Sequence, residues 1–125
     1  MSNKENGMTP RQKWETQLVT KFGKGNVAFI KVKRGAAYFR RPEVEEWEEM
    51  QSLRQNPDGT TNRQAYARLV HQCFAGAWVD GEHSTMSLSD IAKLEGPGFI
   101  GGPAGAVVNK LAGTGERQAT FLGDD

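Results

Sequence analysis

The chain has 125 residues, of which 37% are hydrophobic and 25% are charged, and its formal net charge is +1. This length and composition predict a single small domain and exclude a wholly disordered chain. No apolar run approaches the roughly 20 residues that a membrane-spanning helix needs, and the single cysteine, Cys73, excludes a disulfide within the chain.

The charges are distributed unevenly along the chain. From Met1 to Arg41, ten Lys or Arg stand against two Glu, a net charge of +8. From Pro42 to Asp125, six stand against thirteen acidic residues, a net charge of −7. Such asymmetry is typical of a nucleic-acid surface, but also of two faces that meet within a fold or across a protein interface.

The chain begins with a polar segment, residues 1–8, which we expect to be a disordered N-terminus. A helix is predicted after it, because Thr9 and Gln12 form a capping box, Pro10 suits the first helical position and Gly23 can end the helix. The apolar stripe of this helix consists of Trp14, Leu18 and Phe22.

The next segment, NVAFIKVKRGAAYFRRP, alternates in polarity and predicts a β-hairpin with its turn at Arg34-Gly35. One face of the hairpin is expected to join the core. The other face is expected to be wet, with cations lying against aromatic rings. The core face would carry Ile30, Val32, Ala37 and Phe39, and the wet face Phe29, Lys31, Tyr38 and Arg40.

Pro42 cannot donate a hydrogen bond in a sheet and suits the first turn of a helix, so the strand is predicted to become a helix there. This helix extends to about Gln55 and has glutamates at its start, where the helix dipole favours negative charge. Its aromatic residue is Trp47, for which core packing and partner contact are both open. The segment QNPDGT predicts a turn after the helix.

The remaining segments predict a mainly helical body. A helix with a capping box at Thr61 and Gln64 has apolar residues spaced as far as Ala77. The segment VDGEHSTM is interpreted as a loop, Ser87 and Asp90 begin a shorter helix, and EGPGFIGGPAG is interpreted as a loop.

Pro103 can start a last helix that ends at Gly113. The expected fold is therefore α+β: an N-terminal helix, one β-hairpin and a mainly α-helical body of about four helices. A single domain is expected over residues 9–113, followed by a flexible C-terminal tail over residues 114–125.

Few residues suggest a catalytic, cofactor-binding or metal-binding role. Gly96, Gly98 and Gly101 match a dinucleotide-binding pattern, but a predicted helix precedes them where a strand would be needed. Cys73 lies on an apolar helical stripe and is interpreted as a core residue. We therefore expect no enzyme activity, no catalytic residue, no cofactor and no metal site.

The run KFGKGNVAFIKVKRGAAYFRRPEVEEWEEM, residues 21–50, resembles the tail assembly chaperones of long-tailed bacteriophages. In that family a Tyr/Phe-Gly-Lys-like turn leads to two strands, an aromatic-Arg-x-Pro element and an acidic helix with an aromatic residue. The corresponding residues here are Phe22, Gly23 and Lys24; Phe39, Arg40, Arg41 and Pro42; and Glu46, Trp47 and Glu48.

The resemblance implies a non-enzymatic chaperone that binds the tape-measure protein and helps to recruit the tail tube protein in the cytoplasm of the infected bacterium. Such proteins are typically absent from the mature virion. Self-association is left open, and a membrane is not an expected partner. We expect the helices containing residues 66–74 and 107–111 to border the client surface, and the hairpin and the helix at residues 42–55 to act as a scaffold. The candidate partner-binding residues are Tyr38, Arg40, Arg41, Trp47, Tyr66 and Trp78.

The alternative function is nucleic-acid binding by the basic hairpin. Cations interleaved with aromatic residues on a pair of strands can hold single-stranded nucleic acid through phosphate contacts and base stacking. The acidic helix that follows could instead neutralise this surface within the fold, so nucleic acid is not the favoured partner. The residues in question are Phe29, Lys31, Lys33, Arg34, Tyr38, Arg40 and Arg41.

Overall fold

The computed structural model describes residues 7–113 and 120–121. The segments expected to be disordered or flexible lie mostly outside these residues, at 1–6, 114–119 and 122–125. The elements in chain order are α2 (Pro10–Phe22), β1 (Val27–Val32), β2 (Gly35–Arg40), α3 (Val44–Leu53), α4 (Arg63–Cys73), β3 (Phe74–Val79), β4 (Glu82–Ser84), α5 (Leu88–Glu95), the π-helical turn η1 (Ile100–Ala104), α6 (Gly105–Leu111) and β5 (Thr120–Phe121).

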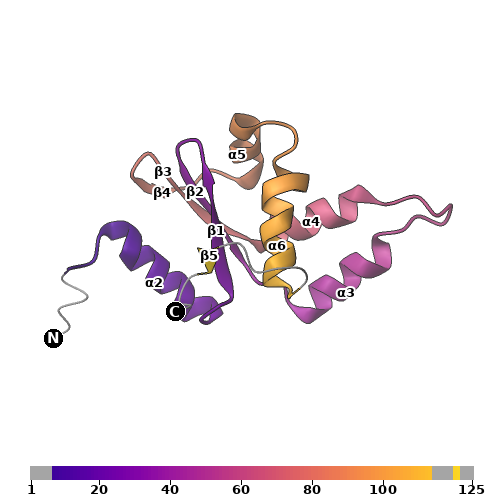
Figure 1. Cartoon of the computed structure of the whole chain (residues 1–125), viewed down its shortest axis with the longest axis horizontal. Coiled ribbons are helices and arrows are strands. Elements are labelled where there is room, and N and C mark those ends of the chain that lie inside the picture. The colour runs from indigo at the N-terminus through magenta and orange to yellow at the C-terminus, as the bar shows by residue number, and fades with distance from the viewer. Residues whose placement is uncertain (1–6, 114–119, 122–125) are drawn as a thin grey trace.

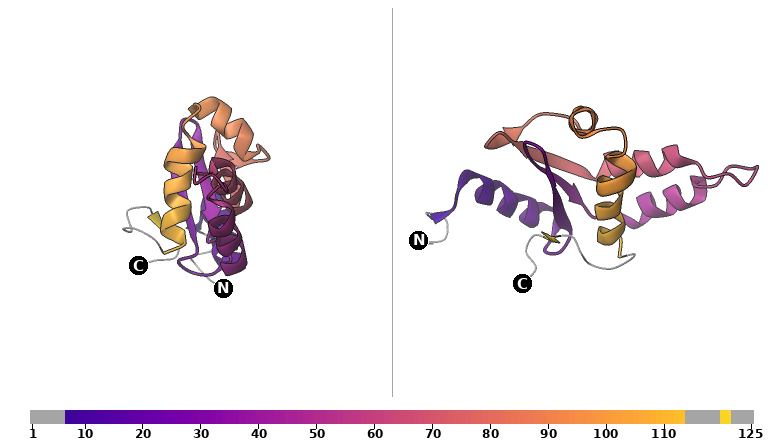
Figure 2. Two further views of the ribbon diagram at one scale, coloured as in Figure 1. Left: turned by 90° about the vertical axis from the view of Figure 1, so that its right-hand side faces the viewer. Right: turned by 45° about the horizontal axis from the view of Figure 1, so that its top comes forward.

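The fold is α+β, and its centre is an antiparallel sheet. Within the described residues the strand order is β4-β3-β2-β1-β5, and β5 contributes only two residues, which pair with Ala28 and Phe29 of β1. Helix α2 lies on one side of the sheet, and α3, α4 and α6 lie on the other (Figures 1 and 2). Helices α3 and α4 form a helical hairpin that extends away from the sheet.

The expectation of a single β-hairpin is wrong. Helix α4 ends at Cys73, and the chain continues directly into β3, which forms a second hairpin with β4. The turn of this hairpin is Asp80-Gly81, with φ angles of 53° and 85°, the conformation in which Asp-Gly is favoured between paired strands. The segment interpreted as a loop after residue 78 is therefore largely a β-turn and a strand.

The predicted hairpin of β1 and β2 is confirmed, but its turn is one residue earlier than expected. Val32 pairs with Gly35, so the turn residues are Lys33 and Arg34. Gly35 is required by the packing of neighbouring strands and not by the turn, because a Cβ at this position would lie 1.7 Å from the carbonyl oxygen of Trp78 in β3. The glycine permits close approach of two strands that are distant in sequence.

The main core lies between the sheet and the helices on the side of α3, α4 and α6. The predicted core face of the hairpin is confirmed here: Ala37 and Phe39 are fully buried, and Ile30 and Val32 are partly buried and pack against the same core cluster. Cys73 is also fully buried, and burial raises the pKa of its thiol to about 12. At neutral pH this group is a protonated, apolar part of the core.

The opposite face of the sheet was expected to be wet. It forms instead a second core under α2. Tyr38 is fully buried, and the Trp14 ring of α2 meets it edge-on, with ring centroids 4.6 Å apart. The cation over these rings is Arg11 of α2, at 5.4 Å from the Phe29 centroid, and not a hairpin lysine. The expectation is wrong because the apolar stripe of α2 covers this face.

The capping box predicted at Thr9–Gln12 is present, and Ser87 and Asp90, predicted to begin a helix, form another one. Two other helix starts differ from the prediction by one or two residues. Helix α3 begins at Val44, after Pro42 rather than at it. The capping box predicted at Thr61 and Gln64 is wrong, because α4 is capped by Asn62, whose side chain accepts a hydrogen bond from the Gln64 amide at 3.1 Å. Local signals therefore locate these starts only approximately.

The glycine-rich segment before α6 is not a simple loop. It ends in the π-helical turn η1, which continues into α6, so Pro103 lies inside a helical segment and not at its start. Pro103 has no amide hydrogen to donate, and the Ala104 amide donates instead to the Phe99 carbonyl at 3.1 Å. Phe99 and Ala104 are buried and hold this wide turn against the core.

No helix within the described residues is long and apolar enough to cross a membrane.

Candidate functional site

The two arginines of the charge-reversal segment are engaged within the fold. Arg40, at the end of β2, forms a two-pronged ion pair with Glu46 of α3, at 2.8 and 2.9 Å. Arg40 also donates to the Gln72 carbonyl of α4 at 2.9 Å. The guanidinium thus connects the sheet to two helices, and its hydrogen bonds hold the pKa of Glu46 below the ordinary value.

Arg41 and Arg34 also have partners in the described part of the chain. The Arg41 Nε donates to the Leu111 carbonyl at the end of α6, and Arg34 pairs with Asp80 across the turns of the two hairpins. A hairpin whose arginines are held in this way offers less free positive charge than its sequence suggests. This observation disfavours the nucleic-acid alternative.

The candidate aromatic residues fall into two groups. Tyr38 and Trp78 belong to the core under α2, where Trp78 lies against Trp14 with ring centroids 5.8 Å apart. Trp47 and Tyr66 lie together on the other side of the sheet, at an open cavity. Tyr38 is fully buried, and among these four aromatic residues Trp47 and Tyr66 are the two that line this cavity.

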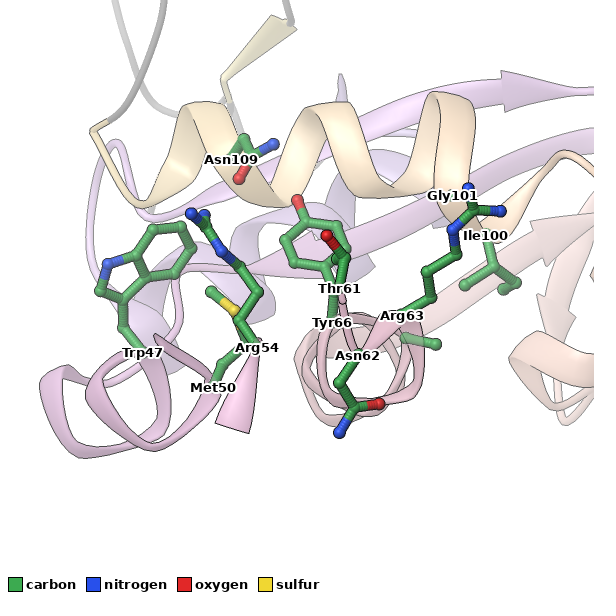
Figure 3. Close-up of a pocket in the computed structure, with 11 residues that line it drawn as sticks. Trp47, Met50, Arg54, Thr61, Asn62, Arg63, Tyr66, Ile100, Gly101 and Asn109 are labelled. Atoms are coloured by element: carbon green, nitrogen blue, oxygen red, sulfur yellow. The ribbon is translucent and has the colours of Figure 1, made fainter. Parts of the chain in front are cut away.

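This cavity, called the Trp47 groove below, has a volume of about 550 Å³. Helix α3 with the start of α4 forms one side, and η1 with α6 forms the other (Figure 3). Among the described residues that line it, none is acidic. Its wall includes Trp47, Met50, Arg54, Arg63, Tyr66 and Asn109.

Tyr66 spans the groove from α4 toward α6. Its hydroxyl donates a hydrogen bond to the Gly105 carbonyl at 2.6 Å, and burial raises its pKa to about 12. The residue is therefore a neutral phenol at physiological pH, fixed at its tip and offering its ring to the groove. Met50 is 4% exposed and completes an apolar floor beside Trp47.

Gly105 sets the distance between Tyr66 and α6. A Cβ at Gly105 would lie 2.9 Å from Tyr66 Cε1 and 3.1 Å from the Ile100 carbonyl oxygen. We expect Gly105→Ala to lower the free energy of unfolding by about 1–3 kcal/mol, the usual cost of overpacking. Chemical denaturation measures this change.

Gly102→Ala is the matched control, because a Cβ at Gly102 meets nothing within 4 Å. This variant should be neutral or slightly stabilising, since alanine restricts the unfolded chain. Equal stability of the two variants would contradict the assigned packing of Tyr66 on α6.

Sequence reasoning missed Arg54 and Arg63 as groove residues. The loop between α3 and α4 folds back on itself, and the Gln55–Thr61 bridge brings its two ends together. The turn sequence QNPDGT was the available signal, because a tight turn between two helices places its flanking residues close together. Helix α3, interpreted as scaffold, also lines the groove through Trp47 and Met50.

Comparison with protein-family models, with curated proteins and with solved structures yields no match to the chain. Within the described residues, no group of three or more His, Cys, Asp or Glu side chains is arranged to hold a metal ion. The Trp47 groove is therefore the feature from which a function is argued.

Proposed function

We propose that the protein is a non-enzymatic tail assembly chaperone of a long-tailed bacteriophage. In this proposal it binds a helical segment of the tape-measure protein in the cytoplasm of the infected bacterium, keeps that client from aggregating and helps to bring it to the tail tube protein. The proposal rests on the sequence resemblance over residues 21–50 and on one structural observation, the Trp47 groove.

The groove has the features of a helix-binding site. Its floor is apolar, with Met50 buried and the rings of Trp47 and Tyr66 half-buried. Amphipathic helices bind proteins by placing apolar side chains in such grooves, and partly exposed aromatic residues are frequent anchors at interfaces. The flanking helices α3, α4 and α6 provide walls that are already formed before a client arrives.

The proposal is tested by co-expressing the chain with the tape-measure protein encoded by the same phage. The wild-type protein should increase the fraction of the client that stays in solution and should co-purify with it. Removal of one aromatic anchor in Trp47→Ala is expected to weaken binding of a purified client segment by about 30-fold, since loss of a central anchor costs about 2 kcal/mol.

A second variant tests the groove by filling it. Ala67 lines the groove on α4, so Ala67→Trp should also weaken client binding. Gln64→Trp adds the same side chain to the same helix at an exposed position outside the groove, and it should bind as the wild type does. Client binding that is unchanged in both Trp47→Ala and Ala67→Trp, with both variants folded, would refute the proposal.

A further inference from the structure

The Trp47 groove carries two arginines whose charges are not neutralised within the described part of the chain. Arg54 and Arg63 are both exposed, and neither side chain has a hydrogen bond or an ion pair with another described residue. Arg34 and Arg40, by contrast, each have a carboxylate partner. The contrast separates arginines that are paired with carboxylates of the fold from arginines whose guanidinium groups are open to a ligand.

The two arginines lie on either side of the aromatic floor. Figure 3 shows Arg54 beside Trp47 on one side of Tyr66, and Arg63 extending toward Ile100 on the other side. The acidic residues of α3 that are exposed, such as Glu45 and Glu48, do not line the groove. The groove therefore combines an apolar centre with positive charge at both ends.

We propose that the segment bound in this groove is an amphipathic helix in which acidic side chains flank the apolar anchors on the same face. This inference rests on the proposed function and specifies the chemistry of the client. On a helix, residues three or four apart lie on one face, so carboxylates one turn before and one turn after an apolar anchor can reach Arg54 and Arg63 while the anchor lies against Tyr66. Arginine is well suited to two-pronged pairing with carboxylates.

The test uses three helical peptides of about 20 residues, a length at which alanine-rich sequences are helical in water. They share one apolar stripe and carry Glu, Gln or Lys at the flanking positions. Their affinities for the full chain are measured by fluorescence anisotropy. The Glu peptide should bind about tenfold more tightly than the Lys peptide at low salt, and this ratio should decrease with added salt, because rim charges are screened.

A charge reversal in the protein should invert this preference. The double variant with Arg54→Glu and Arg63→Glu is expected to prefer the Lys peptide. Arg68→Glu is the matched control, because Arg68 is exposed on α4 but does not line the groove, and it should keep the wild-type preference. Unchanged circular dichroism spectra establish that the variants are folded.

The outcomes separate this inference from the proposed function. Equal binding of all three peptides, with loss of binding in Trp47→Ala, would overturn the acidic preference and leave the helix-binding groove intact. Absence of binding to any peptide would overturn both. A single-stranded oligonucleotide that displaces the Glu peptide at equal concentration would also overturn the inference, because arginines and aromatic rings can bind nucleic acid through phosphates and stacking.

Discussion

Replacement of Tyr38 by alanine is expected to lower the free energy of unfolding by about 3–5 kcal/mol, the range found for deletion of large buried rings. Tyr38 is fully buried between the sheet and α2, with the Trp14 ring edge-on at 4.6 Å and the Phe29 ring at 5.3 Å. Chemical denaturation measures the loss, and amide hydrogen exchange should show faster exchange in α2.

Tyr38→Phe serves as the control, because it keeps the ring and removes only the hydroxyl. That hydroxyl donates to Glu15 and accepts from the Arg11 Nε at 2.8 Å, while burial raises the Tyr38 pKa above its ordinary value. The phenylalanine variant should lose about 1–2 kcal/mol. A loss below about 1 kcal/mol in Tyr38→Ala would contradict a second core under α2.

Arg40→Ala is expected to lower the free energy of unfolding by about 2–4 kcal/mol, because removal of one partner from a largely buried pair leaves the other charge without compensation. The Arg40 and Glu46 side chains are only 19% and 20% exposed. The variant also removes the hydrogen bond to the Gln72 carbonyl. Urea denaturation of the variant and the wild type measures the difference.

Arg34→Ala is the matched control, since its pair with Asp80 is about half exposed and such pairs contribute little. The pH dependence provides a second check. The folded state lowers the pKa of Glu46 from its ordinary value of 4.5. The stability that this pair contributes is therefore complete above pH 4.5 and is lost as the pH falls through the lower pKa of the folded state. Arg40→Ala should lose less stability than the wild type over that acidic range. Identical pH profiles of stability for the two proteins would contradict the assignment of the lowered Glu46 pKa to its pair with Arg40.

Signals carried by neighbouring residues predicted much of the fold. The capping boxes at Thr9 and Ser87 locate the starts of α2 and α5, because the groups that satisfy the first helical amides lie within the same few residues. The core face of the first hairpin followed from the alternation of polar and apolar residues in the same way.

Other features depended on contacts between distant parts of the chain. Gly35 suggested a turn, yet its role is set by the approach of Trp78 in β3, which no local pattern shows. Phe74 and Ala77 continue the apolar spacing of α4 and also fit a buried strand, so spacing alone does not distinguish the two. The Asp80-Gly81 pair was the local signal for the second hairpin and should have outweighed that spacing.

The sequence predicted only part of the candidate site, because the rest also depends on contacts between distant parts of the chain. Trp47 and Tyr66 stood out as aromatic residues on helices with one apolar face, and the structure places both at the groove. Tyr38 and Trp78 were also named as candidates because they are aromatic, but they lie in the core under α2, since the sheet is covered on both faces. Whether an aromatic residue faces a partner or a core depends on tertiary packing, which single-residue patterns do not encode.

Amide hydrogen exchange of the protein, measured with and without a bound segment of the tape-measure protein, tests the central claim most directly. Client binding in the Trp47 groove predicts added protection in α3, in the first turns of α4, and in η1 and α6, which together form the groove wall. The surface formed by α2 and β4 should be unaffected. Protection confined to α2, β1 and β2, with no change around Trp47 and Tyr66, would contradict the account.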